Sequence, residues 1–463
     1  MHQTVFASLN IVAILLFSYL VPEPHSKMLI ILVFALTGWS MKLLPSAVVS
    51  LTIIVLIPIM GLGTFEDSLS GFSKPFVWLL VSAFVFAAAM EKTGIGKRIA
   101  FNLLYFAKGS TKRTVPFLFL VLIILGFFIP TAAGRTSTII PVCVGMIQVI
   151  KDKQQAVNFA KTIMIGATFT SGFICWALLT GSNSSIYAVA AIQATIGYKW
   201  NYIYWFICSF PIMLVVVGCL WLVLKKLFPI DTEVVPKDDS FIKNELAALG
   251  KMTSAEWRIM ILGILILASW TTEPYHGLSV PLTALIGSII TCLPGIGVQK
   301  WKEVSPVISW DAIILFGAGY AIADTIQRNG TATWIALKIT EFIPTASPFG
   351  AALFILILVL FMRLGFAEML AITATILPIT ISLAEIWGIN PLWLAQVMLI
   401  ACSFGLFFPF QSTSNLLTFS YGYYTEKNLF HTGILLAPMV IVVVLISALY
   451  YWPLVGLNSV LPK

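Results

Sequence analysis

The chain has 463 residues, of which 59% are hydrophobic and only 10% are charged, and its mean hydropathy is +0.98. A soluble domain carries about 25% charged residues, so this composition excludes a protein that faces water on all sides. The net charge of +8 does not indicate a nucleic-acid partner, because the Lys and Arg residues lie in short stretches between apolar runs, where they usually orient a membrane protein.

In lipid, only helices and closed barrels satisfy the backbone hydrogen bonds. The apolar runs are continuous and lack the alternating polarity of barrel strands, so the sequence predicts an all-α polytopic membrane protein. A span needs about 20 residues, and about eleven runs fit that length. They are residues 4–21, 28–43, 46–63, 75–91, 160–198, 202–224, 257–272, 278–294, 309–327, 391–422 and 431–453.

Two further apolar regions, 115–150 and 346–386, each consist of two arms joined by small residues. Lys and Arg flank region 115–150 on both sides, and positive residues mark the cytoplasmic side. We therefore expect a re-entrant hairpin from the cytoplasm with its tip at Pro130–Arg135, and a second from outside with its tip near Leu364–Leu370. On this topology the N-terminus is cytoplasmic and the C-terminus lies outside.

The first tip carries Thr131, Arg135 and Thr136 within an apolar region. An ionisable residue at membrane depth is costly and is a functional candidate by default. Arg suits a carboxylate because its fork donates two parallel hydrogen bonds. The alternative is a structural Arg135 paired with a carbonyl or an acid. The topology places Arg363 in the membrane as well, but no role is predicted for it.

Two of the predicted spans contain polar breaks, TGSNSS at 180–185 and QSTSNLL at 411–417. A break exposes the N-terminus of the following half-helix, which favours an anion, while the freed carbonyls of the preceding half could hold a cation. The alternative is a simple kink. The substrate-binding candidates in the two breaks are Ser182, Asn183, Ser184, Ser412, Thr413, Ser414 and Asn415.

The two halves of the chain are similar to each other. Residues 76–94 align with residues 312–330, and the two segments are expected to cross in opposite directions. Inverted repeats with broken helices are typical of secondary transporters. Glu368 stands in the second tip where the first has Thr131, and it could bind a cation, carry a proton or pair with Arg135. The alternative is an interfacial Glu with ordinary solvation.

At these tips and breaks the sequence resembles the divalent anion–sodium symporter family over nearly its whole length. The family carries Ser-Asn-Thr at each tip, whereas the matching residues here are Thr131-Ala132-Ala133 and Glu368-Met369-Leu370. The string Pro130–Thr136 is instead similar to the tip of citrate and oxoglutarate/malate carriers, where an Arg follows the motif. The resemblance implies a homodimer with a fixed scaffold and an elevator-like moving part.

The expected organisation separates scaffold from transport parts. The segments are 1–113 (scaffold spans and a basic interfacial segment), 114–226 (transport part with the first hairpin), 227–256 (cytoplasmic linker), 257–345 (scaffold) and 346–463 (transport part with the outer hairpin).

The sequence thus favours a plasma-membrane secondary transporter of di- or tricarboxylates, with a small carboxylate and the lipid bilayer as its partners. No cofactor and no metal site are predicted. Sodium-independent exchange is expected first and proton coupling through Glu368 second, with sodium symport as the alternative. A cation/proton antiporter of related architecture is the rival within transport. An intramembrane enzyme is not expected, because HExxH, GxSG and Asp-rich motifs are missing from the sequence.

Overall fold

The computed structural model describes residues 23–41, 44–107, 111–150, 152–230, 240–343, 347–366, 368–405 and 407–460. The regular secondary structure of these ranges is entirely helical, which confirms the predicted fold class. The expected first span, residues 4–21, lies outside them.

The first half of the chain forms helices that follow the predicted apolar runs closely. They are α2 (Pro24–Met41), α3 (Ser46–Ile59), α4 (Phe65–Leu69), α5 (Pro75–Thr93), α6 (Ile95–Tyr105), α7 (Thr111–Gly126), α8 (Ala132–Gln148), α9 (Lys153–Ala177), α10 (Asn183–Ile196) and α11 (Tyr202–Leu227), with the 3-10 turn η1 (Ser70–Ser73). The expected linker contains a further short helix, α12 (Ser240–Leu249).

The second half repeats this order of elements. Its helices are α13 (Ser254–Thr271), α14 (Glu273–His276), α15 (Val280–Cys292), α16 (Trp301–Val304), α17 (Trp310–Arg328), α18 (Thr331–Phe342), α19 (Pro348–Gly365), α20 (Met369–Ile386), α21 (Pro391–Cys402), α22 (Thr413–Phe419), α23 (Glu426–Ile446) and α24 (Trp452–Leu454), with the short elements η2 (Ser305–Val307), η3 (Pro409–Gln411) and η4 (Ser447–Tyr451).

Six helices in the described ranges are long and apolar enough to cross a membrane, or seven if one bent pair counts as a single span. Five more apolar helices are shorter, with 10–17 residues. The expectation of about eleven spans therefore stays a prediction.

The structure supports the predicted repeat. Helix α5 ends at Gly94 and α17 is followed by Gly330, and both glycines have a left-handed φ, 74° and 72°. A short helix, a helical hairpin, a broken helix and a long helix then follow in each half. The hairpins are α7–α8 and α19–α20, and the broken helices are α9–α10 and α21–α22.

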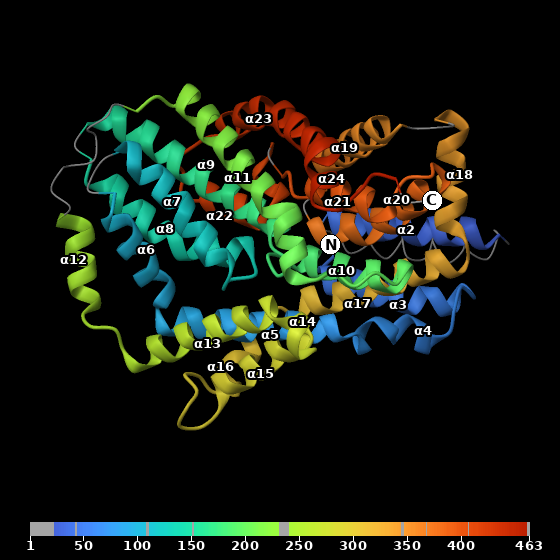
Figure 1. Ribbon diagram of the computed structural model, residues 1–463, viewed down its shortest axis with the longest axis horizontal. Helices are drawn as coiled ribbons and strands as arrows, with labels where there is room; N and C mark the ends of the chain where they lie inside the picture. The colour runs from blue at the N-terminus through green and yellow to red at the C-terminus, as the bar shows by residue number, and fades with distance from the viewer. Residues whose placement is uncertain are drawn as a thin grey trace, which may run out of the picture.

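The second halves of the broken helices pack on the hairpin of the opposite half, while α9 and α21 pack on the hairpin of their own half. Helix α22 of the second half packs against α8 and α9 of the first (Figure 1), while α10 of the first half packs against α20 of the second. Both hairpin tips and both breaks meet as a result. Helix α17 packs against α3 and α20, so the scaffold helices border this meeting point.

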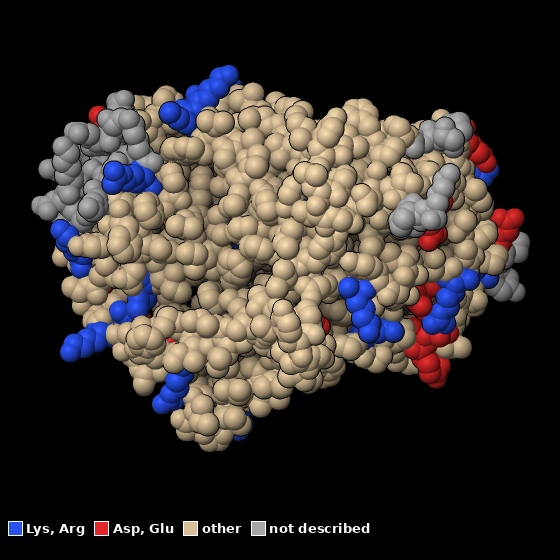
Figure 2. Space-filling view, in the orientation of Figure 1, with Lys and Arg blue, Asp and Glu red and all other residues tan. Residues whose placement is uncertain are grey.

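Charged side chains gather toward the two ends of the elongated molecule, and a broad band between them is almost free of charge on the face that Figure 2 shows. The basic end holds α6 and α12 (Figure 1). At the other end α4 and α17 are joined by an ion pair of 2.6 Å between Arg328 and Asp67, and this partner lowers the pKa of Asp67 to about 2. The uncharged band fits a lipid-facing surface.

Candidate functional site

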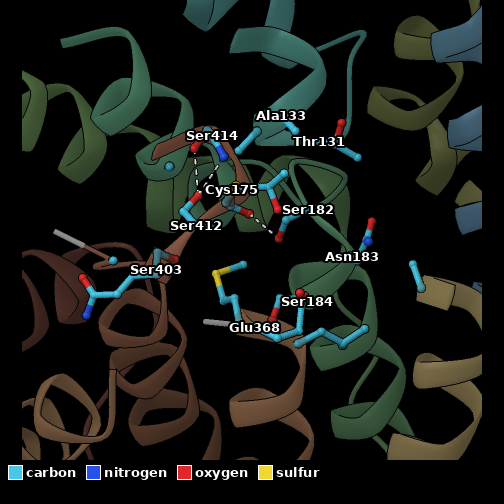
Figure 3. A pocket seen from close by; sticks show the side chains of 18 of the residues that line it. Thr131, Ala133, Cys175, Ser182, Asn183, Ser184, Glu368, Ser403, Ser412 and Ser414 are labelled. Atoms are coloured by element: carbon cyan, nitrogen blue, oxygen red, sulfur yellow. Dashed lines mark hydrogen bonds between the residues drawn. The ribbon is translucent and has the colours of Figure 1, made fainter. Parts of the chain in front are cut away.

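Four helix starts face one cavity with a volume of about 470 Å³. Helices α8, α10, α20 and α22 each begin on its wall, two of them at hairpin tips and two at breaks. Figure 3 shows their first residues around an open centre. The residues that these starts contribute are Thr131, Ala132, Ala133, Ser182, Asn183, Ser184, Glu368, Met369, Leu370, Ser412, Thr413, Ser414 and Asn415.

Hydroxyl side chains cap three of these helix starts. The Oγ1 of Thr131 accepts from the backbone N–H of Gly134 at 3.1 Å, and the Oγ of Ser182 accepts from that of Ser185 at 3.1 Å. Ser412 caps α22 in the same way. Such caps satisfy one of the free N–H groups of a helix start and leave others for an anion.

The break between α9 and α10 begins after Ala177, and the chain then passes so close to the end of α9 that position 181 has room only for glycine. A Cβ at this position would collide with the carbonyl oxygen of Ile174. The hydroxyls of Ser182 and Ser185 both donate to the carbonyl of Cys175, at 3.1 and 2.5 Å, which satisfies an acceptor freed at the end of α9. The predicted break is confirmed.

Ser184 and Asn183 have different surroundings. The hydroxyl of Ser184 lies 2.7 Å from that of Thr373, which joins the first break to the α19–α20 hairpin. The side chain of Asn183 lines the cavity, and its Oδ1 has no hydrogen-bond partner in the described part of the chain. Because a buried amide oxygen without a partner is costly, Asn183 is well placed to meet a ligand or water.

The break between α21 and α22 lies earlier than its polar motif predicted, since α22 already begins at Thr413. Its N-cap is Ser412, which is therefore the structural counterpart of Ser182. Counted from these N-caps, Thr413 and not Asn415 is the counterpart of Asn183. The Ser-Asn pairs of the two motifs, Ser182-Asn183 and Ser414-Asn415, therefore do not occupy equivalent positions in the two breaks.

Asn415 is an internal brace of the second break. Its Nδ2 donates to the carbonyls of Gly405 at 2.7 Å and Phe408 at 3.3 Å, and its Oδ1 accepts from Thr168 at 2.7 Å. Its side chain is buried, although it contributes to the cavity wall. The bond to Thr168 ties α22 to α9, across the two halves of the chain.

Arg135 does not reach the cavity. Its side chain is completely buried, and its Nη atoms donate to the carbonyls of Ile129 at 2.7 Å, Gly181 at 3.1 Å and Ser171 at 2.7 Å. The expectation that its fork binds a substrate carboxylate does not fit, because backbone acceptors already occupy both Nη atoms. The alternative, an Arg paired with carbonyls, fits. Thr136 is likewise buried away from the cavity, with its hydroxyl 3.1 Å from that of Ser171.

The wall also contains residues that the sequence analysis did not select. Arg363 lines the cavity, and its Nη atoms donate to the carbonyls of Phe366 at 2.9 Å and Gln411 at 2.7 Å. An Arg within an apolar arm was the available signal. Asp311, at the start of α17, adds a carboxylate from the scaffold side, where only proximity in space connects it to the tips.

The cavity therefore lies between two sets of helices, the hairpins with the broken helices on one side and the scaffold helices on the other. The hairpins and broken helices form most of its wall, and α3, α5 and α17 close it through Ser46, Phe84 and Leu315. No group of three or more His, Cys, Asp or Glu side chains is arranged to hold a metal ion in the described ranges. Helix N-termini, hydroxyls and an amide suit a small polar anion, and Glu368 and Asp311 are the carboxylates on the wall.

A family model described as the sodium:sulfate symporter transmembrane region matches residues 2–458. The chain is 26% identical to a protein named "Membrane protein" from Cupriavidus necator, covering 98% of this chain and 93% of that one. It is 25% identical to the sodium-dependent dicarboxylate transporter SdcS of Staphylococcus aureus strain USA300, covering 92% and 86%.

Two solved structures are similar in fold. The YdaH transporter of Alcanivorax borkumensis superposes with a TM-score of 0.54 at 13% identity, over 84% of this chain and 87% of that one. MtrF of Neisseria gonorrhoeae, described as an antimetabolite efflux pump, also gives 0.54, at 12% identity over 92% and 95%. At this identity the likeness concerns the fold alone.

Proposed function

The chain belongs to the sodium:sulfate symporter transmembrane family, and on that premise we propose that it is a secondary transporter that carries a small dicarboxylate across the cell membrane. The chain is a multi-pass membrane protein of a transporter family, so catalysis is not proposed. A dicarboxylate is chosen because SdcS, a relative over nearly the whole chain, is named for dicarboxylate transport.

The observation that carries this proposal is the convergence of four helix starts on one cavity. The starts of α8 and α10 present free N–H groups and a partial positive charge of about half a unit, which favours an anion, while α20 begins at the carboxylate of Glu368 and α22 has only seven residues. Because the starts come from opposite sides of the cavity, they suit a ligand with negative charge at both ends. The volume of about 470 Å³ falls within the usual range of small-molecule sites.

The substrate would contact the cavity-lining side chains from the two breaks and the first tip. We assign binding to Thr131, Ser182 and Asn183 on one side and to Ser412 and Thr413 on the other, since all line the cavity. Ser184, Ser414 and Asn415 would hold the wall in shape through their bonds within the protein. Arg135 and Thr136 would act from behind the wall.

The position of the cavity between these two sets of helices suggests how the substrate would cross the membrane. The parts 114–226 and 346–463 hold the hairpins and broken helices, while 1–113 and 257–345 hold the scaffold helices that close the cavity, and 227–256 connects the halves. An elevator movement of the first set against the second, within a homodimer, would expose the cavity on either side. The basic end with α6 and α12 would face the cytoplasm, with the N-terminus inside and the C-terminus outside.

Three couplings are open to such a carrier. Sodium is supported by the family description and by the name of SdcS. Exchange of one anion for another is the expectation from the altered tips. A proton carried by Glu368, which lies on the cavity wall, is the third.

The proposal is tested by counterflow in proteoliposomes that contain the purified protein. Labelled succinate outside should accumulate when unlabelled succinate is inside, in buffers with sodium and in buffers with choline. Sulfate and citrate serve as competitors. Protein-free liposomes are the control. Failure of succinate to move or to bind under every ion condition would overturn the proposal, and proton movement without any carboxylate would favour the antiporter instead.

A further inference from the structure

Two arginines lie beside the cavity with their guanidinium groups buried, and each joins a hairpin tip to a helix break. Arg135 joins the carbonyl of Ile129 in the first tip to that of Gly181 in the first break. Arg363 joins the carbonyl of Phe366 in the second tip to that of Gln411 in the second break. Arg135 forms no ion pair within 4.0 Å in the described part of the chain, whereas Arg363 interacts electrostatically with the carboxylate of Glu368.

The tip carbonyls occupy equivalent positions in the two halves. Ile129 stands two residues before Thr131, the N-cap of α8. Phe366 stands two residues before Glu368, the N-cap of α20. The same backbone group of each tip is thus turned toward an arginine.

The break carbonyls are equivalent in the same sense. Gly181 stands directly before Ser182, the N-cap of α10, and Gln411 stands directly before Ser412, the N-cap of α22. Two carbonyls therefore converge behind each pair of helix starts, and the repeat has produced this cluster twice.

The arginines themselves are not equivalent. Arg135 lies in the first turns of α8, after its tip, whereas Arg363 lies near the end of α19, before its tip. Two side chains from different places in the repeat therefore reach equivalent pairs of carbonyls. The feature that both halves share is a positive charge between tip and break, and the residue that supplies it differs.

Carbonyls freed at broken helices are the groups with which transporters coordinate a sodium ion. Here the guanidinium nitrogens lie 2.7–3.1 Å from those oxygens and carry the same sign of charge as sodium. The Nη2 of Arg363 lies so close to Gly405 that a Cβ at position 405 would collide with it, so glycine leaves the room that the guanidinium occupies. A sodium ion at the same oxygens would have to displace a buried guanidinium.

We propose that the guanidinium groups of Arg135 and Arg363 are resident cations that fill both carbonyl clusters, so that the chain binds its dicarboxylate without sodium. This inference rests on the proposed function and specifies its coupling. The residues here do not fit a sodium ion at either cluster, which differs from the sodium dependence that the family description and the name of SdcS suggest.

The first test measures the wild-type protein in matched sodium chloride and choline chloride. Binding of labelled succinate is followed by scintillation proximity, and the melting temperature is followed without substrate. Equal affinity in both salts, with no sodium-specific rise in melting temperature, is the expected result.

Succinate binding that requires sodium would overturn the inference and leave the proposed function standing. Absence of succinate binding in both salts would overturn the proposed function. The melting temperature then decides alone, because a site that binds sodium in the folded protein must raise it. A sodium-specific rise counts against resident cations, and equal melting in both salts supports them.

The second test removes one resident cation with Arg363→Ala. Arg258→Ala is a matched control, because exposed Arg258 also donates to two backbone carbonyls, those of Gly295 and Ile296, outside the cavity. In choline, Arg363→Ala should lose at least about tenfold in succinate affinity, the loss of a charged hydrogen bond. Added sodium or guanidinium chloride should restore part of it, and Arg258→Ala should respond to neither.

Full affinity of Arg363→Ala in choline would contradict the inference. An equal loss in choline, sodium and guanidinium by folded protein would also contradict it, since Arg363 would then be a structural brace. Arg363→Lys keeps the charge and should bind in choline more tightly than Arg363→Ala. If Arg363→Ala does not fold, the wild-type sodium test still decides.

Discussion

The two break asparagines, alike in sequence, are expected to fail in different ways when replaced by alanine. Asn183 lines the cavity, where its Nδ2 can donate to a substrate carboxylate, while its Oδ1 is an acceptor without a partner in the described residues. Asn415 makes three hydrogen bonds, to Gly405, Phe408 and Thr168. Substrate binding should therefore depend on Asn183, and the fold of the break between α21 and α22 should depend on Asn415.

The magnitudes follow from these contacts. Asn183→Ala removes no bond within the described protein, so the free energy of unfolding should barely change. Loss of a hydrogen bond to a charged carboxylate costs about 1.5–3 kcal/mol, or roughly 10- to 150-fold in affinity. Asn415→Ala breaks three bonds at about 1 kcal/mol each, so a loss of roughly 3 kcal/mol of stability is expected.

The assay is a melting curve in detergent combined with succinate binding for each variant. Asn183→Ala should melt with the wild type and bind weakly, while Asn415→Ala should melt clearly lower. Asn102→Ala is a matched control, because exposed Asn102 donates only to the carbonyl of Arg98, in its own helix. Equal melting losses for Asn183→Ala and Asn415→Ala, or normal binding by Asn183→Ala, would refute the reasoning.

Three further predictions concern the walls of the cavity. Gly181→Ala should destabilise the protein or prevent folding, because its Cβ would collide with backbone carbonyls, whereas Gly218→Ala, with nothing within 4 Å, should be tolerated; expression and melting temperature check both. Ser184→Ala and Thr373→Val should be non-additive in a double-mutant cycle of succinate uptake, with a coupling of about 1 kcal/mol, and additive effects would show that their 2.7 Å contact is unimportant. Asp311→Asn should tighten succinate binding by about two- to fivefold at low salt, because it removes a like charge from the wall, and a weaker affinity on binding isotherms would show that Asp311 assists the substrate.

Much of the backbone could be predicted from local sequence. The apolar runs predicted most of the longer described helices, Gly, Pro and hydroxyl residues marked the first hairpin tip and the break after α9, and small residues marked the second tip. These features depend on neighbours along the chain, because helix length, capping and chain reversal are local properties. The start of α22 was misplaced, since several hydroxyls in a row can each serve as the cap.

The direction of the side chains depended on the tertiary structure. Arg135 lies in a tip that faces the cavity, and its chemistry suits a carboxylate. Its actual partners, Gly181 and Ser171, are distant in sequence, and their carbonyls are brought to it only by the packing of α8 on α9. A buried donor binds the acceptors that the fold places within reach.

The sequence by itself determined a helical membrane transporter with repeated halves, two hairpin tips and two helix breaks, because hydropathy and helix-breaking residues act on their neighbours along the chain. Only the tertiary structure decided that the second halves of the broken helices pack on the hairpin of the opposite half, that Asp311 closes the wall, and that Arg135 and Arg363 hold carbonyls behind the helix starts. These contacts join segments that are far apart in the chain, and no local sequence pattern predicts which of these segments meet in space.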